Sequence, residues 1–376
     1  MADLRTHVTE RLASVPALSA TIVGSGTAVR WEQSAPVVTD RLRVRRLPLG
    51  GSVKDAVRDL DDDPFPPDGP QWDMTLLHGH EPDRYALVYR VNHGVQDMGG
   101  VVYALEALFS AQPVPAAHSS GVVRALGDFR RAAPLDVAAA AVGLARLSAR
   151  ADWPMPEHPC SGRRAFHWAS VPTGLLRSAS RPYGGSANDA YIASLTRAVA
   201  AWAAEHAPRI APDGLPLMVA VNLRRPAEAD ALGNYVFGAR LAGPGREVSV
   251  EGSLRAAVRA TARIKTASGR EAIRRLQRAM PRRFLHNAMR SVRTTRTGGV
   301  LCSSHVLRHP LQFRGDPVHA VDSLTTLPAG APASVLLLTY RGRSSAHFVT
   351  DPALPGMEAL HRQWEEAVHL QARSAV

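Results

Sequence analysis

Residues 85–100 read Tyr-Ala-Leu-Val-Tyr-Arg-Val-Asn-His-Gly-Val-Gln-Asp-Met-Gly-Gly. The first seven, Tyr85–Val91, are mostly apolar, aromatic or β-branched, which predicts a buried strand. Residues 99–109 carry apolar side chains at helical spacing, which predicts a helix. The polar segment between them is therefore predicted to be a loop at the end of a strand, a place where catalytic side chains commonly sit.

This loop contains His93 and, four residues later, Asp97. Histidine suits proton transfer near neutral pH because its ordinary pKa is about 6.5. A nearby carboxylate can orient the imidazole or hold the loop, and the glycines at 94, 99 and 100 allow a tight backbone path. The spacing alone is a weak pattern, since a histidine in a loop is more often simply exposed.

Length and composition indicate a globular protein of two or three domains. The chain has 376 residues, of which 45% are hydrophobic and 21% charged, so a disordered chain is not expected. No apolar run approaches the roughly 18 residues that a membrane span needs, and the first residues do not resemble a secretory signal. Two cysteines, Cys160 and Cys302, cannot form a disulfide framework. These features predict a cytoplasmic protein.

The arrangement of predicted elements favours an α+β fold, because helices and strands mix without regular alternation. We expect a first half at residues 1–147, a loop-rich linker at 148–164 and a second half at 165–376. Strands are predicted at Leu42–Leu47, Leu217–Val221, Ser334–Tyr340 and Ala346–Thr350, and helices at Thr6–Leu12, Ser186–His206 (with Ser186 or Asn188 as its N-cap) and Pro355–Ala372. Arg341-Gly342-Arg343 predicts the turn of a hairpin.

The positive charge is concentrated in one stretch. Residues 251–298 hold thirteen Lys and Arg against two acids, nearly the whole net charge of +12. An apolar stripe through Ile273, Leu276, Met280 and Phe284 predicts a helix, kinked or restarted at Pro281. The other faces carry arginines, and the two interpretations are a solvated face or a docking face for an anion. The docking candidates are Arg274, Arg275, Arg278, Arg282 and Arg283.

The anion can be the phosphates of coenzyme A, an acidic carrier protein, an anionic membrane or nucleic acid. Nucleic acid is disfavoured, because aromatic interleaving and known recognition signatures are absent. Neither a G-x-S-x-G elbow nor a P-loop occurs. His78-Gly79-His80 lacks the setting of a zinc site, so no metal is predicted.

Several further segments of the sequence, taken in order along the chain, match motifs of one known superfamily. Together with the His93 loop they resemble the H-H-x-x-x-D-G superfamily of coenzyme-A-dependent acyltransferases, which includes chloramphenicol acetyltransferase and peptide-synthetase condensation domains. The closest likeness is to the wax ester synthase/diacylglycerol acyltransferase family. The matching segments are Pro70–Leu77 (P-L-W-E), Ser186–Ala190 (N-D), Asn222–Pro226 with Leu232–Val236 (R-P and L-G-N), Ser303–Val306 (T-S-N-V) and Thr339–Gly342 with Asp351 (S-Y-x-G and D).

Three positions depart from the family pattern. Asn92 replaces the first histidine of the pair, Met98 replaces the glycine after the aspartate, and His305 replaces the asparagine of T-S-N-V. An intact His93 with altered surroundings suggests changed substrates, or lost activity.

The resemblance implies two chloramphenicol acetyltransferase-like α/β halves with a channel between them. It implies that His93 is the general base and that an acceptor hydroxyl or amine attacks an acyl thioester directly, without a cofactor beyond the coenzyme A or phosphopantetheine that carries the acyl group. It also implies that Asp97 pairs with an arginine, Arg224 or Arg225. Candidates for the oxyanion donor or the channel lining are Gly99, Ser304, Asn234 and Tyr340.

The leading hypothesis is thus an acyltransferase of lipid or specialised-metabolite biosynthesis, with an acyl-coenzyme A or acyl-carrier donor and a small-molecule acceptor. The alternative is a catalytically altered protein that binds acyl-carrier proteins or other anionic partners without acyl transfer. A third hypothesis is a basic surface for a membrane, bound but not spanned, or for nucleic acid.

Overall fold

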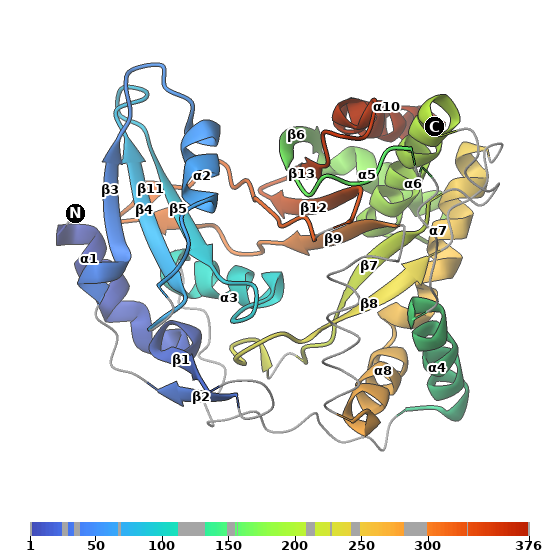
Figure 1. The fold of residues 1–376 in the computed structure, drawn as a ribbon, viewed down its shortest axis with the longest axis horizontal. Coiled ribbons are helices and arrows are strands. Elements are labelled where there is room, and N and C mark those ends of the chain that lie inside the picture. Colours follow the sequence, from blue (N-terminus) through green and yellow to red (C-terminus); the bar gives the residue numbers. More distant parts are fainter. Residues whose placement is uncertain are drawn as a thin grey trace. The chain divides into compact units, whose positions relative to one another are not determined.

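The computed structural model of the protein describes residues 2–24, 29–33, 38–66, 69–111, 132–148, 155, 157–207, 215–225, 228–241, 249–281, 299–328 and 330–374. The chain divides into two compact units, each with its own principal sheet (Figure 1). Unit 1 comprises residues 1–125, 224–235 and 309–317, and unit 2 comprises residues 126–223, 236–308 and 318–376. This division differs from the predicted boundary at 147, because residues 126–147 belong to unit 2 and two later segments return to unit 1.

Unit 1 is built on a three-stranded sheet in the order β3-β4-β5, with β3 parallel and β5 antiparallel to β4. Trp72 at the start of β4 is fully buried, and its indole N–H donates to the carbonyl of Leu18 at 3.0 Å. Next to it, buried Asp73 accepts two hydrogen bonds from Arg90 of β5, at 3.0 and 2.5 Å, which fixes the pairing of these strands. The elements of unit 1 are α1 (Ala2–Arg11), β1 (Ala20–Val23), β2 (Arg30–Gln33), β3 (Leu42–Arg46), α2 (Val53–Asp61), β4 (Trp72–His78), β5 (Tyr85–Val91), α3 (Met98–Phe109), β10 (Gln312–Phe313) and β11 (Asp316–Pro317).

Unit 2 is built on a six-stranded mixed sheet in the order β6-β13-β12-β9-β7-β8. Its largest core cluster joins residues of the sheet to helices α5, α6 and α10, and it includes fully buried Trp202, Phe348 and Trp364. The elements of unit 2 are α4 (Pro134–Ser148), β6 (Ala165–Pro172), α5 (Thr173–Ser180), α6 (Ala187–His206), β7 (Leu217–Asn222), β8 (Val236–Leu241), α7 (Val250–Lys265), α8 (Ala267–Ala279), β9 (Val300–Val306), β12 (Ala333–Tyr340), β13 (Arg343–Thr350) and α10 (Leu360–Arg373).

The predicted α+β class is confirmed, and most predicted elements exist with small shifts at their ends. The strand at Tyr85–Val91 has the predicted bounds, and the helix after the loop begins one residue early, at Met98. Two differences have local causes. The final helix begins at Leu360 rather than Pro355, after a short 3-10 turn at Met357–Ala359. Helix α8 ends at Ala279, because the residue before Pro281 is pushed out of the helical conformation.

The predicted hairpin joins β12 and β13 through the two residues Arg341 and Gly342. Both have positive φ, 48° and 80°, as a type I′ turn requires. We expect Gly342→Ala to lower the free energy of unfolding by about 1 kcal/mol, because an L-residue in the left-handed region costs roughly that much. An added Cβ would meet nothing within 4 Å, so the substitution tests conformation alone.

A matched substitution should have the opposite sign. Gly143 lies inside α4, and its added Cβ would also meet nothing within 4 Å. Gly143→Ala should raise the free energy of unfolding by about 0.5–1 kcal/mol, because alanine loses less entropy in a helix. Urea denaturation of both variants measures the difference, and two changes of the same sign would contradict this explanation.

Candidate active site

The loop between β5 and α3 is shaped by the side chain and carbonyl of Asn92. The Asn92 side-chain oxygen accepts from the Gly94 N–H at 2.9 Å, and its main-chain oxygen accepts from the Val95 N–H at 2.8 Å. Asparagine favours this geometry because its side chain can satisfy a backbone donor two residues later. The turn places His93 at its tip with the imidazole exposed.

Asp97 closes the other end of the loop as the N-cap of α3. Its carboxylate accepts from the Gly100 N–H at 3.0 Å and from the Tyr235 N–H at 2.7 Å, and it forms an ion pair with Arg224. Both partners of this pair are buried, with 5% of Asp97 and 9% of Arg224 exposed. The pair therefore joins the start of α3 to the segment 224–235, which lies far away in the sequence.

Arg224 organises that segment as well. Its guanidinium donates to the carbonyls of Gly233 at 2.8 Å and Ala231 at 3.3 Å, and it lies over the ring of Tyr235 at 5.0 Å. The structure thus pairs Asp97 with Arg224 and not with its neighbour Arg225, whose N–H donates to Glu228 at 2.9 Å. The Asp97 carboxylate is buried and its oxygens already accept from Gly100, Tyr235 and Arg224. Asp97 therefore stabilises the loop and does not face solvent.

The pKa of Asp97 reflects two opposing effects. Burial by itself would raise it, but the Arg224 guanidinium and the N–H donors of Gly100 and Tyr235 lower it below the ordinary value of 3.8. A lowered pKa means that the ionised carboxylate stabilises the fold above pH 3.8 and that this contribution is lost as the pH falls through the folded-state value.

Asp97→Asn cannot titrate, so its stability deficit should depend on pH. We expect the difference in unfolding free energy between the native protein and this variant to be largest near pH 7. The difference should begin to shrink below about pH 4, because the carboxyl then becomes protonated in the unfolded state, and it should be smallest once the pH falls below the lowered pKa of the folded protein. Urea denaturation from pH 7 down to pH 3 measures it, and a deficit that stays constant would exclude this role for the ionised carboxylate.

A second asparagine holds the same turn from the opposite side. The Asn234 side-chain N–H donates to the carbonyl of His93 at 2.8 Å and approaches that of Gly94 at 3.4 Å. Asn92 and Asn234 therefore bind the N–H and the C=O of one peptide group, the one joining His93 to Gly94. Sequence reasoning placed Asn234 among the oxyanion or channel candidates and treated Asn92 only as a departure from a motif. The N-x-G pattern of a turn was the signal that could have revealed Asn92.

Within the described residues the imidazole of His93 forms no hydrogen bond, and the residue is exposed at the tip of the turn. Gly99, in the first turn of α3, is half-buried, and its amide donates to none of the described residues. A free N–H at a helix N-terminus suits a developing negative charge. Among the described residues, neither the His93 imidazole nor the Gly99 amide has a hydrogen-bond partner, so both have open hydrogen-bonding capacity.

The other two oxyanion or channel candidates lie in unit 2, where their hydroxyl protons are engaged. The Ser304 hydroxyl donates to the Asn188 side chain at 2.5 Å, which ties β9 to the start of α6. The Tyr340 hydroxyl donates to the carbonyl of Val318 at 3.2 Å, and this tyrosine is buried. Next to Asn188, buried Asp189 pairs with Lys265 and accepts from the Ser186 N–H at 2.6 Å, so this pair of residues caps and braces α6.

The predicted basic docking face needs one correction. Arg274 is fully buried, and its guanidinium donates to the carbonyl of Leu223 at 2.5 Å, because the end of β7 needs a donor inside unit 2. It is therefore not available to an anion. Arg275 and Arg278 are exposed, as predicted for a solvated or docking face. Arg282 and Arg283 lie outside the described residues.

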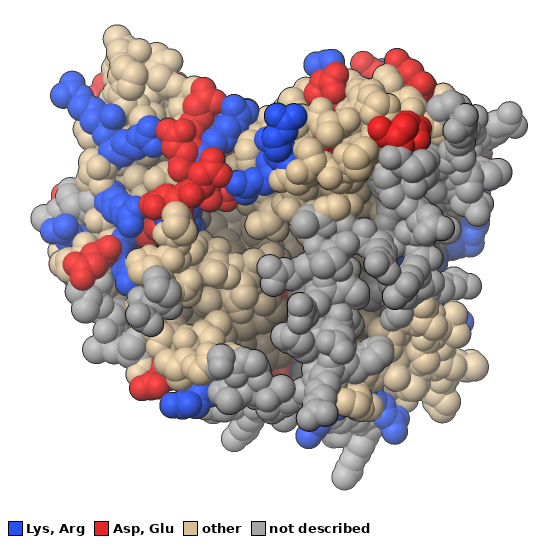
Figure 2. All heavy atoms as spheres, viewed as in Figure 1, with Lys and Arg blue, Asp and Glu red and all other residues tan. Residues whose placement is uncertain are grey.

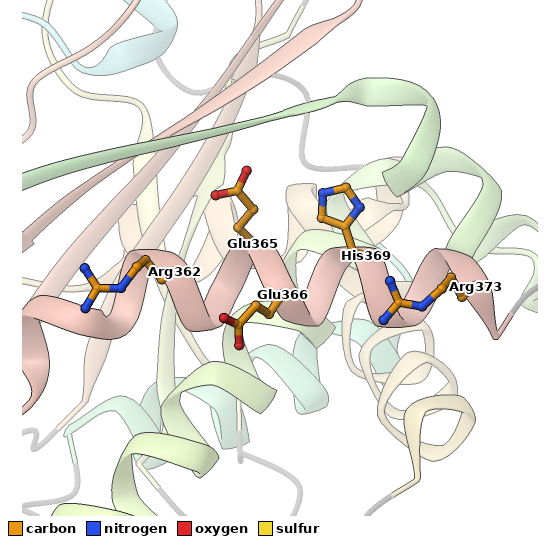
Figure 3. A pocket seen from close by; sticks show the side chains of 5 residues that line it. All are labelled: Arg362, Glu365, Glu366, His369 and Arg373. Carbon is orange, nitrogen blue, oxygen red and sulfur yellow. The ribbon is translucent and has the colours of Figure 1, made fainter.

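A hollow on the outer surface of α10 does not resemble a substrate site. Its lining comes from a single helix, with Arg362, Glu365, Glu366, His369 and Arg373 along its exposed side (Figure 3). Ligand sites usually converge from several elements. The described part of the chain holds no cluster of His, Cys, Asp or Glu suited to a metal ion. None of the described helices has the length and apolar character needed to cross a membrane.

Comparison of the sequence with known proteins finds distant relatives. No protein-family profile matches the chain. It is 29% identical over 262 residues to a Mycobacterium tuberculosis (strain ATCC 25618 / H37Rv) protein named "putative diacylglycerol O-acyltransferase", covering 58% of this chain and 52% of that protein. A second protein of that strain, with the same name, is 23% identical over 208 residues, covering 52% and 46%. The chain thus spans about half the length of the curated relatives it matches.

Comparison of the fold gives similarity over the whole chain. The wax ester synthase/diacylglycerol acyltransferase from Marinobacter aquaeolei VT8 has a TM-score of 0.62 at 14% identity, covering 100% of this chain and 90% of that one. The starter condensation domain of rhizomide synthetase, solved with C8-CoA and Leu-SNAC, has a TM-score of 0.63 at 15% identity, covering 100% and 86%. An epimerization domain of tyrocidine synthetase B has a TM-score of 0.59 at 11% identity, covering 100% and 88%.

These comparisons define the fold, which is similar to that of condensation domains and of a wax ester synthase/diacylglycerol acyltransferase. The predicted resemblance to wax ester synthase/diacylglycerol acyltransferases is confirmed by both the fold and the distant relatives. The fold by itself does not define the reaction, since an epimerization domain shares it.

Proposed function

We propose that this protein is an acyltransferase that joins an acyl group from a thioester to an acceptor hydroxyl or amine. The observation that carries the proposal is the His93 turn. The imidazole is exposed, and the peptide group that follows it is held by hydrogen bonds with Asn92 and Asn234. The buried Asp97–Arg224 ion pair anchors the end of the same loop. A general base needs this combination of accessibility and fixed position.

The reaction balances with His93 as the sole proton carrier. The imidazole takes the proton of the acceptor O–H or N–H while that oxygen or nitrogen bonds to the thioester carbonyl carbon. The carbonyl oxygen becomes an oxyanion, for which the Gly99 N–H is the donor that this loop offers. The carbonyl then re-forms, the C–S bond breaks, and the imidazolium returns its proton to the departing thiolate. An ester or amide and a free thiol result, and no covalent enzyme intermediate is required.

The relatives support the choice of substrates. The Mycobacterium tuberculosis proteins carry the name "putative diacylglycerol O-acyltransferase", and the rhizomide condensation domain was solved with C8-CoA. We therefore propose acyl-coenzyme A or an acyl-carrier protein as donor, a small molecule as acceptor, and a place in lipid or specialised-metabolite biosynthesis in the cytoplasm. No cofactor is proposed beyond the thiol that carries the acyl group.

The test is a thiol-release assay with the purified protein. A panel of acyl-coenzyme A and acyl-carrier thioesters is mixed with a pool of alcohols and amines, free thiol is followed, and products are identified by mass. Thiol release that requires an acceptor and yields a matching ester or amide supports the proposal. If the folded protein releases no thiol with any member of the panel, the alternative is favoured, namely that it binds acylated carriers without transferring the acyl group.

A further inference from the structure

Helix α4 carries an apolar face that the described residues of its own unit leave exposed. The sequence has no ionisable residue between Asp136 and Arg146. Ala140 packs on the core cluster that contains Ile273, so this side of the helix faces inward. The opposite side exposes Leu135 by 76% and Val142 by 52%, together with exposed alanines at 138, 141 and 145. Large exposed apolar side chains that share one helix face indicate a contact surface.

Helix α8 lies beside α4 (Figure 1). At their starts, the Ser268 hydroxyl bonds to Asp136 at 2.5 Å and to the Ala133 N–H at 3.1 Å. One turn later, Ala140 reaches the cluster of Ile273. Extending this parallel alignment by 1.5 Å per residue, we expect the last turn of α8 to lie beside the second half of α4. That turn exposes Arg275 and Arg278.

The acidic groups of these two helices are withdrawn from the surface. Asp136 has a side chain only 18% exposed and is occupied by Ser268 and by Arg263 at 3.7 Å, while Glu271 is buried. In the view of Figure 2 the surface over α4 shows no acidic side chain, and Lys or Arg side chains lie at its edge. The α4/α8 face, defined as Leu135, Ala138, Val142, Arg275 and Arg278, is therefore apolar on one helix and cationic on the next.

We infer that the α4/α8 face binds the surface of an anionic lipid bilayer. A helix in the plane of a membrane buries apolar side chains at the acyl boundary while cations meet the phosphates. Arginine suits the border, because its aliphatic stem stays with the apolar layer and its charge reaches the headgroups. An acidic protein surface could pair with the arginines, but it would not explain why Leu135 and Val142 are exposed. Helix α4 is about 22 Å long at 1.5 Å per residue, enough to lie along the interface.

The test is sedimentation of the full chain with vesicles of phosphatidylcholine alone and of phosphatidylcholine with about 30% phosphatidylglycerol. Binding is expected to the anionic vesicles and should weaken as salt is added. Arg275→Glu/Arg278→Glu should reduce the partition coefficient by about 25-fold, at about fivefold for each arginine near the surface. Leu135→Glu/Val142→Glu should reduce it by about tenfold or more.

Matched control variants distinguish binding through this face from attraction by net charge and from nonspecific binding of exposed apolar side chains. Arg362 and Arg373 are exposed on α10, and Val44 and Leu49 are exposed by 44% and 78% in unit 1. Arg362→Glu/Arg373→Glu and Val44→Glu/Leu49→Glu should leave vesicle binding within about twofold of the native protein. All four variants change exposed side chains, so circular dichroism and melting should show that they remain folded.

Three outcomes would overturn the inference. One is no binding to anionic vesicles by folded protein. The second is an equal loss in the control variants, which would show attraction by net charge alone. The third is native protein that is a dimer by light scattering and that becomes a monomer in Leu135→Glu/Val142→Glu while vesicle binding is kept, which would assign the face to a second copy. None of these measurements needs catalytic turnover, so they stand apart from the proposed acyl transfer.

Discussion

Replacing Arg224 by alanine is expected to remove about 3–5 kcal/mol from the free energy of unfolding of unit 1. The reason is the Asp97 carboxylate, which is 5% exposed and would be left buried without its countercharge. The same substitution removes the donors to the carbonyls of Gly233 and Ala231, so the segment that carries Asn234 loses its anchor as well. Guanidinium denaturation followed by fluorescence measures the loss.

Arg225→Ala provides the neighbouring control. Arg225 is half-buried and its guanidinium is not the partner of Asp97, so we expect a loss well below that of Arg224→Ala. The double variant Asp97→Asn/Arg224→Gln should be more stable than the sum of its single variants allows, by roughly 1–3 kcal/mol, because neither change then leaves a lone buried charge. Equal losses for Arg224→Ala and Arg225→Ala would show that the ion pair does not hold the loop.

The loop itself could be predicted from the sequence because its signals are local. The apolar strand Tyr85–Val91, the helical spacing after Gly99 and an aspartate at the helix start are all visible within 25 residues. The partner of Asp97 is 127 positions away. The resemblance to the family limited the candidate partners of Asp97 to Arg224 and Arg225. No local sequence pattern indicates which of the two adjacent arginines forms the ion pair. The choice depends on which guanidinium packs over Tyr235 and reaches the carbonyls of Gly233 and Ala231.

Arg274 shows what a helical pattern omits. The apolar stripe through Ile273 and Leu276 leaves Arg274 among the polar faces, yet the residue is fully buried. Its position is decided by the carbonyl of Leu223, a buried acceptor 51 residues earlier in the chain that needs a donor. The same holds for the hydroxyls of Ser304 and Tyr340, whose acceptors Asn188 and Val318 lie on other elements. Long-range hydrogen bonds of this kind leave no periodic trace in the sequence.

Asn92 shows the converse, a departure from a motif that the structure explains. At this position the family has a histidine, and the substitution suggested altered chemistry. In the structure Asn92 instead supplies the acceptor for the Gly94 N–H and so shapes the turn that presents His93. The replacement is therefore compatible with an ordered site.

His93→Ala is expected to lower kcat/KM for acyl transfer by about 10²–10⁴-fold, the usual contribution of a general base. The free energy of unfolding should change by less than about 0.5 kcal/mol, because the imidazole is exposed and bonds to none of the described residues. His369→Ala is the matched control, since His369 is an exposed histidine on α10, and its activity should stay within twofold of the native rate. Thiol release with the best donor and acceptor pair measures all three proteins.

A pH profile distinguishes a base from a residue that merely orders the loop. Asn92→Asp keeps the side-chain oxygen that accepts from the Gly94 N–H, so the turn should survive. The added carboxylate belongs to the residue that precedes His93, and its negative charge should favour the protonated imidazole. Because a base must be unprotonated, the acid limb of the rate profile should move to higher pH, with the plateau rate largely retained. An unmoved limb, with chemistry shown to limit the rate, would assign His93 a structural role, since loop order does not depend on that proton.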